Sequence, residues 1–405
     1  MLGVLSWKNV WRNKLRSIVV MIAVMLGVFA GVFLIAFSKG MVDGRIQSII
    51  QTEISHIQIH KPGFQVNNDF SLRMNHIDSI MHVVIDTKHV VAASKRIVIS
   101  SLVASAETNT GVKIIGIIPS EEKKVTNIHD KIIAGSYFAS PERNEVVIGL
   151  KLAEKLKVKL HNKIIITLQD VNMNITSGAF RIIGIYQTDN NMFDESTLFV
   201  RYSDICRLTG LDGTSAHEIA IILDNNKNTH TVMQQLKAKL PGLNIQDWTQ
   251  ISPEAGYLVS AMNQYLMIFM LVILLALCFG IVNTMLMVVL ERVKEIGMLM
   301  AVGMSKAKIF FMIMLETVYL STTGGIAGIL IGFILCKHLG KVGLNLYFWK
   351  DVYASVGYSS LIYPKIDLQM GIVIAILVII TGILASLYPA YKALKLNPAE
   401  ATRTD

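Results

Sequence analysis

The chain has 405 residues, of which 52% are apolar and only 17% are charged, and its mean hydropathy is +0.50. Soluble domains carry about 25% charged residues, so this composition excludes a wholly soluble protein. The net charge of +9 arises mostly in short segments beside apolar runs, so we interpret it as membrane topology and expect no nucleic-acid partner.

The first apolar run, Ser17–Phe37, holds 21 residues without a charge. A helix needs roughly 20 residues to cross the hydrocarbon core of a bilayer. The run follows the basic residues Lys8, Arg12, Lys14 and Arg16, as a signal peptide would, but it exceeds the usual signal core of about 7 to 15 residues. We therefore expect a membrane anchor that is retained.

Residues 38–264 have the texture of a folded domain, with basic and acidic residues nearly balanced. The hydrophobic period changes repeatedly between 2 and 3.6, which indicates an α+β fold. Residues 38–51 and 253–264 are expected to extend the flanking spans as helices. The charged run Glu121–Lys124 is expected to be a solvated face. Strands are predicted at 55–60, 96–103, 112–118, 145–148, 163–168, 180–186, 197–200 and 219–223, and helices at 151–157, 202–208 and 229–240.

Three further apolar runs follow this domain, so the sequence predicts one span, a large domain and then three spans. If the N-terminus is cytoplasmic, residues 1–16, 291–308 and 388–405 all lie on the cytoplasmic side. Lys and Arg are in excess in these segments, as is typical of cytoplasmic loops. The fold class is therefore an α-helical membrane protein with four transmembrane helices in a one-plus-three layout and an inserted α+β outer domain. The predicted segments are a cytoplasmic N-terminus 1–16, spans 17–37, 265–290, 309–336 and 368–387, the outer domain 38–264, a cytoplasmic helix 291–308, an outer loop 337–367 and a cytoplasmic tail 388–405.

Motifs for enzyme chemistry are missing from the sequence. It contains no G-x-x-x-x-G-K-[ST] or G-x-G-x-x-G loop for phosphates, no H-E-x-x-H and no G-x-S-x-G. Cys206, Cys278 and Cys336 are interpreted as small apolar side chains. We expect no catalytic residue, no metal site and no cofactor on this chain.

The third span carries two features that an ordinary apolar helix lacks. Gly324, Gly328 and Gly332 recur every four residues, which lets a second helix approach closely on that face. The partner helix could belong to the same chain, or the face could be a moving or subunit contact. Glu316 is an ionisable group in the same span, which is costly in lipid. It could face a water-filled cavity or bond a neighbour such as Thr317 or Tyr319.

The segment between the second and third spans reads ERVKEIGMLMAVGMSKAKIF, a short amphipathic helix with a glycine stop at Gly303. It resembles the E-R-x-x-E-I-G-x-L-x-A-x-G pattern of the permease family that includes the MacB, LolC, LolE and FtsX proteins. The opening WKNVWRNKLRS is similar to that family's basic start, and Pro389, Ala390, Ala393, Pro398 and Arg403 match its ending. In that family the segment is a coupling helix that docks on an ABC ATPase. The resemblance implies coupling roles for Glu291, Arg292, Lys294, Glu295, Gly297 and Gly303.

The outer domain is similar to the periplasmic domain of LolC and LolE, in the stretches 116–125, 147–153 and 180–186. LolC carries a proline-containing hook for its chaperone, whereas Asp170–Gly178 is short and lacks proline. The resemblance therefore implies a MacB-like core domain, but a chaperone or adaptor need not dock on this subunit.

The function implied by the resemblance is that of a permease subunit in a bacterial inner membrane, with both termini cytoplasmic and the large domain periplasmic. Its partners would be an ATPase dimer that binds ATP and Mg, a second permease copy or paralogue, lipoprotein cargo and membrane lipids. Mechanotransmission would extract lipoproteins towards the outer membrane. A tripartite efflux or peptide export permease and a non-transporting signal transducer are the alternatives. A cargo cavity, if these are not ordinary lipid-facing or core methionines, would be lined by Met21, Met25, Met262, Met267 and Met270.

Overall fold

The computed structural model describes residues 2–12, 14–140 and 142–394. The chain divides into two compact units. The first, the span unit, comprises Met1–Val42, Val259–Asn345 and Leu361–Asp405, and the second, the globular unit, comprises Asp43–Leu258 and Leu346–Ser360. The sequence treats 337–367 as a single outer loop, whereas the structure groups its middle part with the globular unit.

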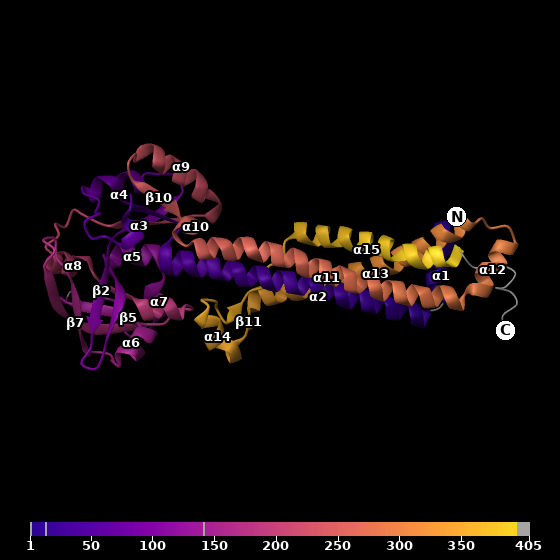
Figure 1. Ribbon diagram of the computed structural model, residues 1–405, viewed down its shortest axis with the longest axis horizontal. Coiled ribbons are helices and arrows are strands. Elements are labelled where there is room, and N and C mark those ends of the chain that lie inside the picture. Colours follow the sequence, from indigo (N-terminus) through magenta and orange to yellow (C-terminus); the bar gives the residue numbers. More distant parts are fainter. Residues whose placement is uncertain (1, 13, 141, 395–405) are drawn as a thin grey trace. The chain divides into compact units, whose positions relative to one another are not determined.

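Four helices in the described part of the chain are long and apolar enough to cross a membrane. Each of the four predicted apolar runs lies inside one of them. Helix α2 continues to Ser48 and α11 begins at Pro253, so helical extensions are present on both sides of the outer domain. The elements are α1 (Leu2–Arg12), α2 (Lys14–Ser48), α11 (Pro253–Glu291), α12 (Val293–Ala301), α13 (Lys306–Val342) and α15 (Leu368–Leu394), with a two-stranded ladder of β11 (Leu344–Asn345) and β12 (Leu361–Ile362) (Figure 1).

Glycines let α13 pack closely against its neighbours. A Cβ atom at Gly324 or Gly328 would lie 2.6 Å from the carbonyl oxygens of Met21 and Met25 on α2, so any side chain there would push the helices apart. Gly332 faces Val32, which also lies on α2. The glycines predicted at four-residue intervals therefore pack within this chain. Such close approach matters in lipid, where no hydrophobic drive brings spans together.

Helix α11 is far less covered than the other spans. Only 6% of its most apolar window is buried, against 33% in each of the other three. Its described side chains include Phe279 and Met267, which are 72% and 76% exposed. So large an apolar surface requires lipid or another protein chain to cover it.

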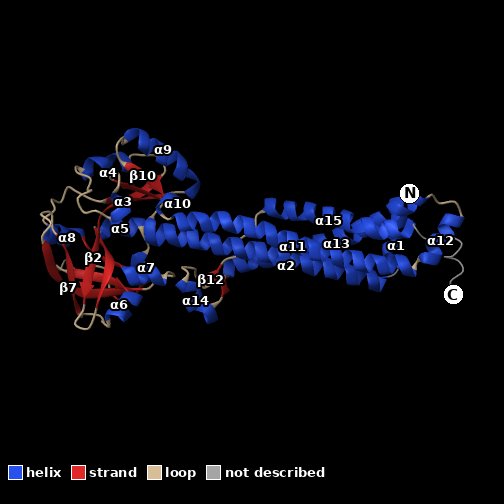
Figure 2. Ribbon diagram, in the orientation of Figure 1, coloured by secondary structure: helices blue, strands red, loops and turns tan. Residues whose placement is uncertain are grey.

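The globular unit is built on a ten-stranded sheet (Figure 2). Its strand order is β10-β1-β9-β2-β3-β8-β5-β7-β4, and β6 pairs with β2 and β7. The strands are β1 (Ile57–His60), β2 (Val90–Ala104), β3 (Asn109–Ile117), β4 (Ile132–Gly135), β5 (Glu145–Gly149), β6 (Lys163–Gln169), β7 (Ile175–Tyr186), β8 (Thr197–Arg201), β9 (Glu218–Leu223) and β10 (Asn244–Asp247). The helices are α3 (Phe64–Asn67), α4 (Ile77–Ile85), α5 (Pro119–Val125), α6 (Leu150–Leu156), α7 (Asn191–Ser196), α8 (Tyr202–Thr209), α9 (Thr229–Lys239), α10 (Trp248–Ile251) and α14 (Lys350–Ser355). A π-helix at Ile49–Ile54 continues α2, and short 3-10 turns lie at Ile128–Lys131, Asn226–Asn228 and Tyr347–Trp349.

The 15-residue strand β2 joins two hydrophobic cores. Its first part, from Val90 to Arg96, pairs with β9, and its second part, from Ile97 to Ala104, pairs with β3 and β6. One core is formed by β1, β9, β10, α4 and α9, and the other by β3, β5 to β8, α6 and α8. The eight predicted strands and three predicted helices are confirmed, most of them to within two residues of their ends.

A buried ionic cluster lies beside β2, and it corrects one expectation. Arg96 bonds Glu122 through Nη2 at 2.5 Å and Glu218 through Nη1 at 2.7 Å, and all three side chains are at most 3% exposed. Glu122 was expected on a solvated face, but it is fully buried, so that expectation was wrong. The reason is tertiary. Helix α5 brings Glu122 against the guanidinium of Arg96 on β2, and no local pattern in the sequence indicates that these two residues meet.

The globular unit is expected to lose stability as the pH falls below about 6.5, the ordinary pKa of histidine. Burial lowers the pKa of His56 to about 4, because a charged ring is disfavoured away from water. Its Nδ1 accepts a hydrogen bond from the Leu223 amide at 3.2 Å, which fits the neutral ring. A folded-state pKa below the unfolded one contributes stability above pH 6.5 that is lost towards pH 4. The urea midpoint of the full chain in detergent should therefore fall between pH 7 and pH 5, and less in His56→Gln.

The exposed His230 provides the matched control, because His230→Gln should leave this pH dependence unchanged. An unchanged slope in His56→Gln would contradict the assignment.

Candidate functional site

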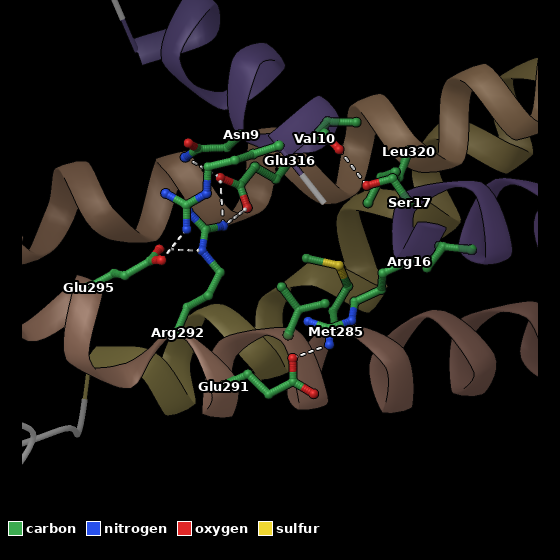
Figure 3. Close-up of a pocket in the computed structure, with 13 residues that line it drawn as sticks. Asn9, Val10, Arg16, Ser17, Met285, Glu291, Arg292, Glu295, Glu316 and Leu320 are labelled. Carbon is green, nitrogen blue, oxygen red and sulfur yellow. Dashed lines mark hydrogen bonds and ion pairs between the residues drawn. The ribbon is translucent and has the colours of Figure 1, made fainter. Parts of the chain in front are cut away.

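A cavity of about 260 Å³ lies where α1, the start of α2, the end of α11, α12 and α13 meet. Figure 3 shows that Arg and Glu side chains from different helices point into it and toward one another. All of its lining residues belong to the span unit. They are Asn9, Val10, Arg12, Arg16, Ser17, Val20, Met285, Val288, Glu291, Arg292, Glu295, Glu316 and Leu320.

The local sequence explains why α12 is a separate helix. Regular helix breaks at Arg292, whose φ of −100° and ψ of 17° lie outside the α region. At the other end, Gly303 adopts a φ of +100°, its amide bonds Met300 O, and the Met304 amide bonds Leu299 O. These two bonds form a Schellman cap, which needs a left-handed residue and so favours glycine. The predicted glycine stop is therefore present.

Arg292 is the centre of the ionic network in this cavity. Its Nη1 lies 3.1 Å from Glu316 Oε2 on α13, and its Nε lies 3.0 Å from Glu295 Oε2 on α12. Asn9 of α1 donates from Nδ2 to Glu316 Oε1 at 2.7 Å. The Glu316 carboxylate is thus held by α1 and by the residue that joins α11 to α12 (Figure 3).

Two further ion pairs connect the N-terminal segment to this network. Arg12 pairs with Glu295, and Arg16 pairs with Glu291 at the end of α11. The hydrogen bond from Arg12 lowers the pKa of Glu295, and the same bond raises the pKa of Arg12. Both partners are charged at neutral pH as a result.

The two kinds of pair differ in energy because they differ in exposure. The Glu316 side chain is 5% exposed and Arg292 18%, whereas Arg12 and Glu295 are 56% and 41% exposed. Removing one partner of a buried pair costs about 3 to 5 kcal/mol, since it leaves a charge buried without its partner. An exposed pair contributes about 1 kcal/mol or less. The Arg292–Glu316 pair therefore dominates.

Helix α1 also contacts α13 directly. Ser6 donates to Met312 O at 3.2 Å, and the Trp7 ring meets the Tyr319 ring edge-on with centroids 5.6 Å apart. Ser17 closes the turn between α1 and α2 by donating to Val10 O. The N-terminal amphipathic helix is thus a fixed part of this site.

The sequence analysis singled out four residues of this cavity, Glu291, Arg292, Glu295 and Glu316, but assigned them different partners. Glu316 was expected either to face a cavity or to bond Thr317 or Tyr319; it lines this cavity, and its bonded partners are Arg292 and Asn9. Glu291, Arg292 and Glu295, which were predicted to contact an ATPase, all have partners within the chain. Asn9, Arg12 and Arg16 were not predicted as site residues. The signal that could have pointed to them is Glu316, because an acidic residue in a span requires a cation nearby.

The remaining predicted coupling residues lie on different sides of α12. Gly297 is buried and Lys294 is exposed. Lys294, Met298 and Val302 are spaced four residues apart and so share one face of the helix; Met298 is 60% exposed and Val302 86%. We call these three residues the coupling stripe.

A second cavity of about 640 Å³ lies between α11 and α15, and its lining is almost wholly apolar. Met267 and Met270 are among its lining residues, together with Met370 and Ile35. Met21, Met25 and Met262 are not; Met21 and Met25 turn their backbones toward the glycines of α13. Two of the five predicted methionines therefore line this cavity, which we call the groove between α11 and α15.

The family ending lies partly in the described residues. Pro389 stands inside α15, and Ala390 and Ala393 are fully buried in the span unit. Pro398 and Arg403 lie outside the described residues. Among the residues that the structure describes, no group of three or more His, Cys, Asp or Glu is placed to hold a metal ion.

Comparison with known proteins gives two family matches that together cover most of the chain. Residues 17–239 match the MacB-like periplasmic core domain, and residues 267–398 match the FtsX-like permease C-terminal region. The lipoprotein-releasing system transmembrane protein LolC of Neisseria meningitidis is 27% identical over 331 residues, which cover 78% of this chain and 79% of that protein.

Two further relatives match a smaller share of this chain. LolC of Xylella fastidiosa is 23% identical over 77% of this chain and 78% of its own length. The macrolide export ATP-binding/permease protein MacB of Syntrophobacter fumaroxidans is 29% identical over 52% of this chain and 27% of its own length.

The relative weight of the two ion pairs can be measured. Arg292→Ala should lower the free energy of unfolding by about 3 to 5 kcal/mol, because it leaves Glu316 buried without its cation. Arg12→Ala should cost about 1 kcal/mol or less, since that pair is exposed. Denaturation of the full chain in detergent tests both.

Lys294→Ala is the control from the same region, because this exposed residue lies outside the cavity and should leave stability unchanged. Equal losses in Arg292→Ala and Arg12→Ala would show that the buried pair is not dominant.

Proposed function

The chain belongs to the family of ABC transporter permeases that combine a MacB-like periplasmic core domain with an FtsX-like C-terminal region, and we propose that it releases lipoproteins from a bacterial inner membrane. ATP would be hydrolysed by a separate ATPase dimer, and a second permease copy or paralogue would complete the complex. The observation that carries the proposal is the similarity to LolC across both units of the chain. The excess of Lys and Arg in the short segments supports cytoplasmic termini and a periplasmic globular unit.

The coupling stripe is the surface that the ATPase would contact. Glu291, Arg292 and Glu295 bind partners within the chain, so they are poorly suited to dock on another protein. Met298 and Val302 present exposed apolar surface at the same helix, and Lys294 adds a positive charge beside them. Buried apolar anchors of this kind contribute most of the affinity in protein interfaces.

Movement of α12 would reach the spans through the ionic network. Arg292 transmits it to Glu316 on α13, and Glu295 transmits it to Arg12 on α1. Closure of the ATPase dimer on ATP would thus shift α1, α12 and α13 together. Because α2 packs on α13 through backbone contacts at Gly324 and Gly328, its position would change with α13.

The groove between α11 and α15 suits the acyl chains of a lipoprotein. Its lining is almost entirely apolar, and Met267, Met270 and Met370 supply flexible thioethers that adapt to chains of different length. An acyl chain could enter from lipid because α11 is so little covered by protein. The groove would hold the lipid part of the cargo while the protein part faces the periplasm.

The docking role of the coupling stripe predicts a defined loss. Met298→Asp with Val302→Asp should weaken association with the ATPase by about tenfold or more, because two apolar anchors are replaced by charge. Co-purification of ATPase and permease from detergent measures this. Folding should be retained, since both side chains are exposed.

Ile133→Asp, an equivalent exchange at a 52% exposed position of the globular unit, is the matched control and should bind the ATPase normally. Normal ATPase binding by the Met298→Asp/Val302→Asp variant would contradict docking through this stripe.

The cargo is tested by reconstitution. Vesicles that contain the chain, its second permease and the ATPase should release a triacylated protein on addition of ATP, and should retain it with a non-hydrolysable analogue. MacB-like relatives keep efflux or peptide export as a second candidate, which predicts ATP-driven movement of unacylated compounds instead. ATP hydrolysis without release of either substrate would favour signal transduction and contradict the proposal.

A further inference from the structure

An exposed apolar stripe lies in the segment between the last two spans. Phe348, Val352 and Val356 are 89%, 64% and 62% exposed. Val352 lies in α14 and Val356 at its C-terminal cap, four residues on, so these two share one face, and Phe348 precedes them in the turn Tyr347–Trp349. Tyr347 and Trp349, 70% and 51% exposed, stand on either side of Phe348 in the chain. We call these five residues the aromatic stripe. The proposed function uses none of them.

The opposite face of the same segment is fixed to protein. Ala354 is buried, and Gly357, at a φ of +77°, lies so close to Arg45 that a Cβ atom would meet its Cζ at 2.7 Å. Arg45 is held in turn by Glu53 at 2.6 Å. The aromatic stripe therefore points away from the unit by construction, and its exposure does not arise from a loose loop.

Chain connectivity keeps the stripe near the membrane surface. Helix α13 ends at Val342 and the segment begins at Leu346, so only three residues separate them, and the Cα atoms of Val342 and Leu346 are at most about 14 Å apart. The exposed Lys337 and Lys341 mark the last turns of α13, where lysine side chains extend to the headgroups. The headgroup region is several ångströms deep on each side of a hydrocarbon core about 30 Å thick, so the stripe lies within its reach.

The composition of the stripe fits a lipid surface better than a protein interface. Tyr and Trp are enriched where hydrocarbon meets water, because their rings are apolar and their polar atoms can reach water. Lys350 lies with its Nζ 5.8 Å from the centre of the Tyr347 ring, so a positive charge accompanies the aromatic side chains. An apolar face flanked by aromatic rings and a lysine is the pattern of a helix that lies in the interface plane.

We propose that the aromatic stripe inserts into the headgroup region of the leaflet opposite α12, with Lys350 beside the lipid phosphates. The inserted segment gives the globular unit an attachment to the bilayer in addition to α2 and α11. The partner is the lipid surface itself, and neither cargo nor ATPase takes part.

Spin labels on the full chain test this directly. Phe348→Cys and Val352→Cys, each with a nitroxide, should be more accessible to oxygen than to a water-soluble nickel chelate in vesicles of phosphatidylethanolamine and phosphatidylglycerol. Asp351→Cys, on an exposed polar position of the same helix, should show the reverse. The native Cys206, Cys278 and Cys336 are replaced by Ala in all three proteins.

Two results would overturn the proposal. Access of the nickel chelate to positions 348 and 352 equal to that at 351 would place the stripe in water, and exclusion of both reagents would place it against protein, such as a second copy of the chain. Tryptophan fluorescence of the chain with its native cysteines gives an independent readout. If Trp349 lies in the headgroup region, brominated lipids quench its fluorescence, so the quenched fraction of the total tryptophan signal should fall in Trp349→Phe. Unchanged quenching in Trp349→Phe would also contradict insertion.

Discussion

A carboxylate inside an apolar helix needs a cation, and this requirement organises the end of the span unit. Glu316 is 5% exposed, and an unpaired charge there would be costly. The cation comes from Arg292, which precedes α12, and Asn9 of α1 completes the set of hydrogen bonds. One buried group thereby binds both α1 and the residue that precedes α12, and it adds to the other contacts that hold these two helices in place. The coupling stripe is presented on the outer side of α12 because its inner side is held by this pair.

The globular unit repeats the same principle in a soluble setting. Arg96 bonds carboxylates from α5 and β9, and it lies on the strand that joins both hydrophobic cores. In each unit a single guanidinium, which can donate in several directions at once, links elements that are distant in sequence. In such clusters an arrangement that separated the partners would leave a buried charge unpaired, which is costly. Such clusters would also keep each element in place under mechanical load.

Local patterns were enough to predict the spans, most of the sheet and the existence of α12. Apolar runs of about 20 residues and alternating strands carry their own signal, and Gly303 marks the end of its helix because its left-handed backbone favours glycine. Tertiary pairings could not be predicted in this way. Glu122 and Arg96 are 26 residues apart, Glu316 and Asn9 are 307 apart, and nothing in the intervening sequence specifies either pair. The same reason explains why residues thought to face an ATPase prove to bind partners within the chain, and why the short edge strands β4 and β10 were missed.

The central claim is that α12 moves with α13 as one body through the Arg292–Glu316 pair. A short bifunctional thiol reagent joining Arg292→Cys to Glu316→Cys, in a background with the native cysteines replaced by Ala, replaces the ion pair with a covalent link. The account predicts that the cross-linked permease still releases a triacylated protein when its ATPase hydrolyses ATP. Loss of release on cross-linking, with recovery after the link is cleaved, would show that the two helices must separate during the cycle and would contradict the account.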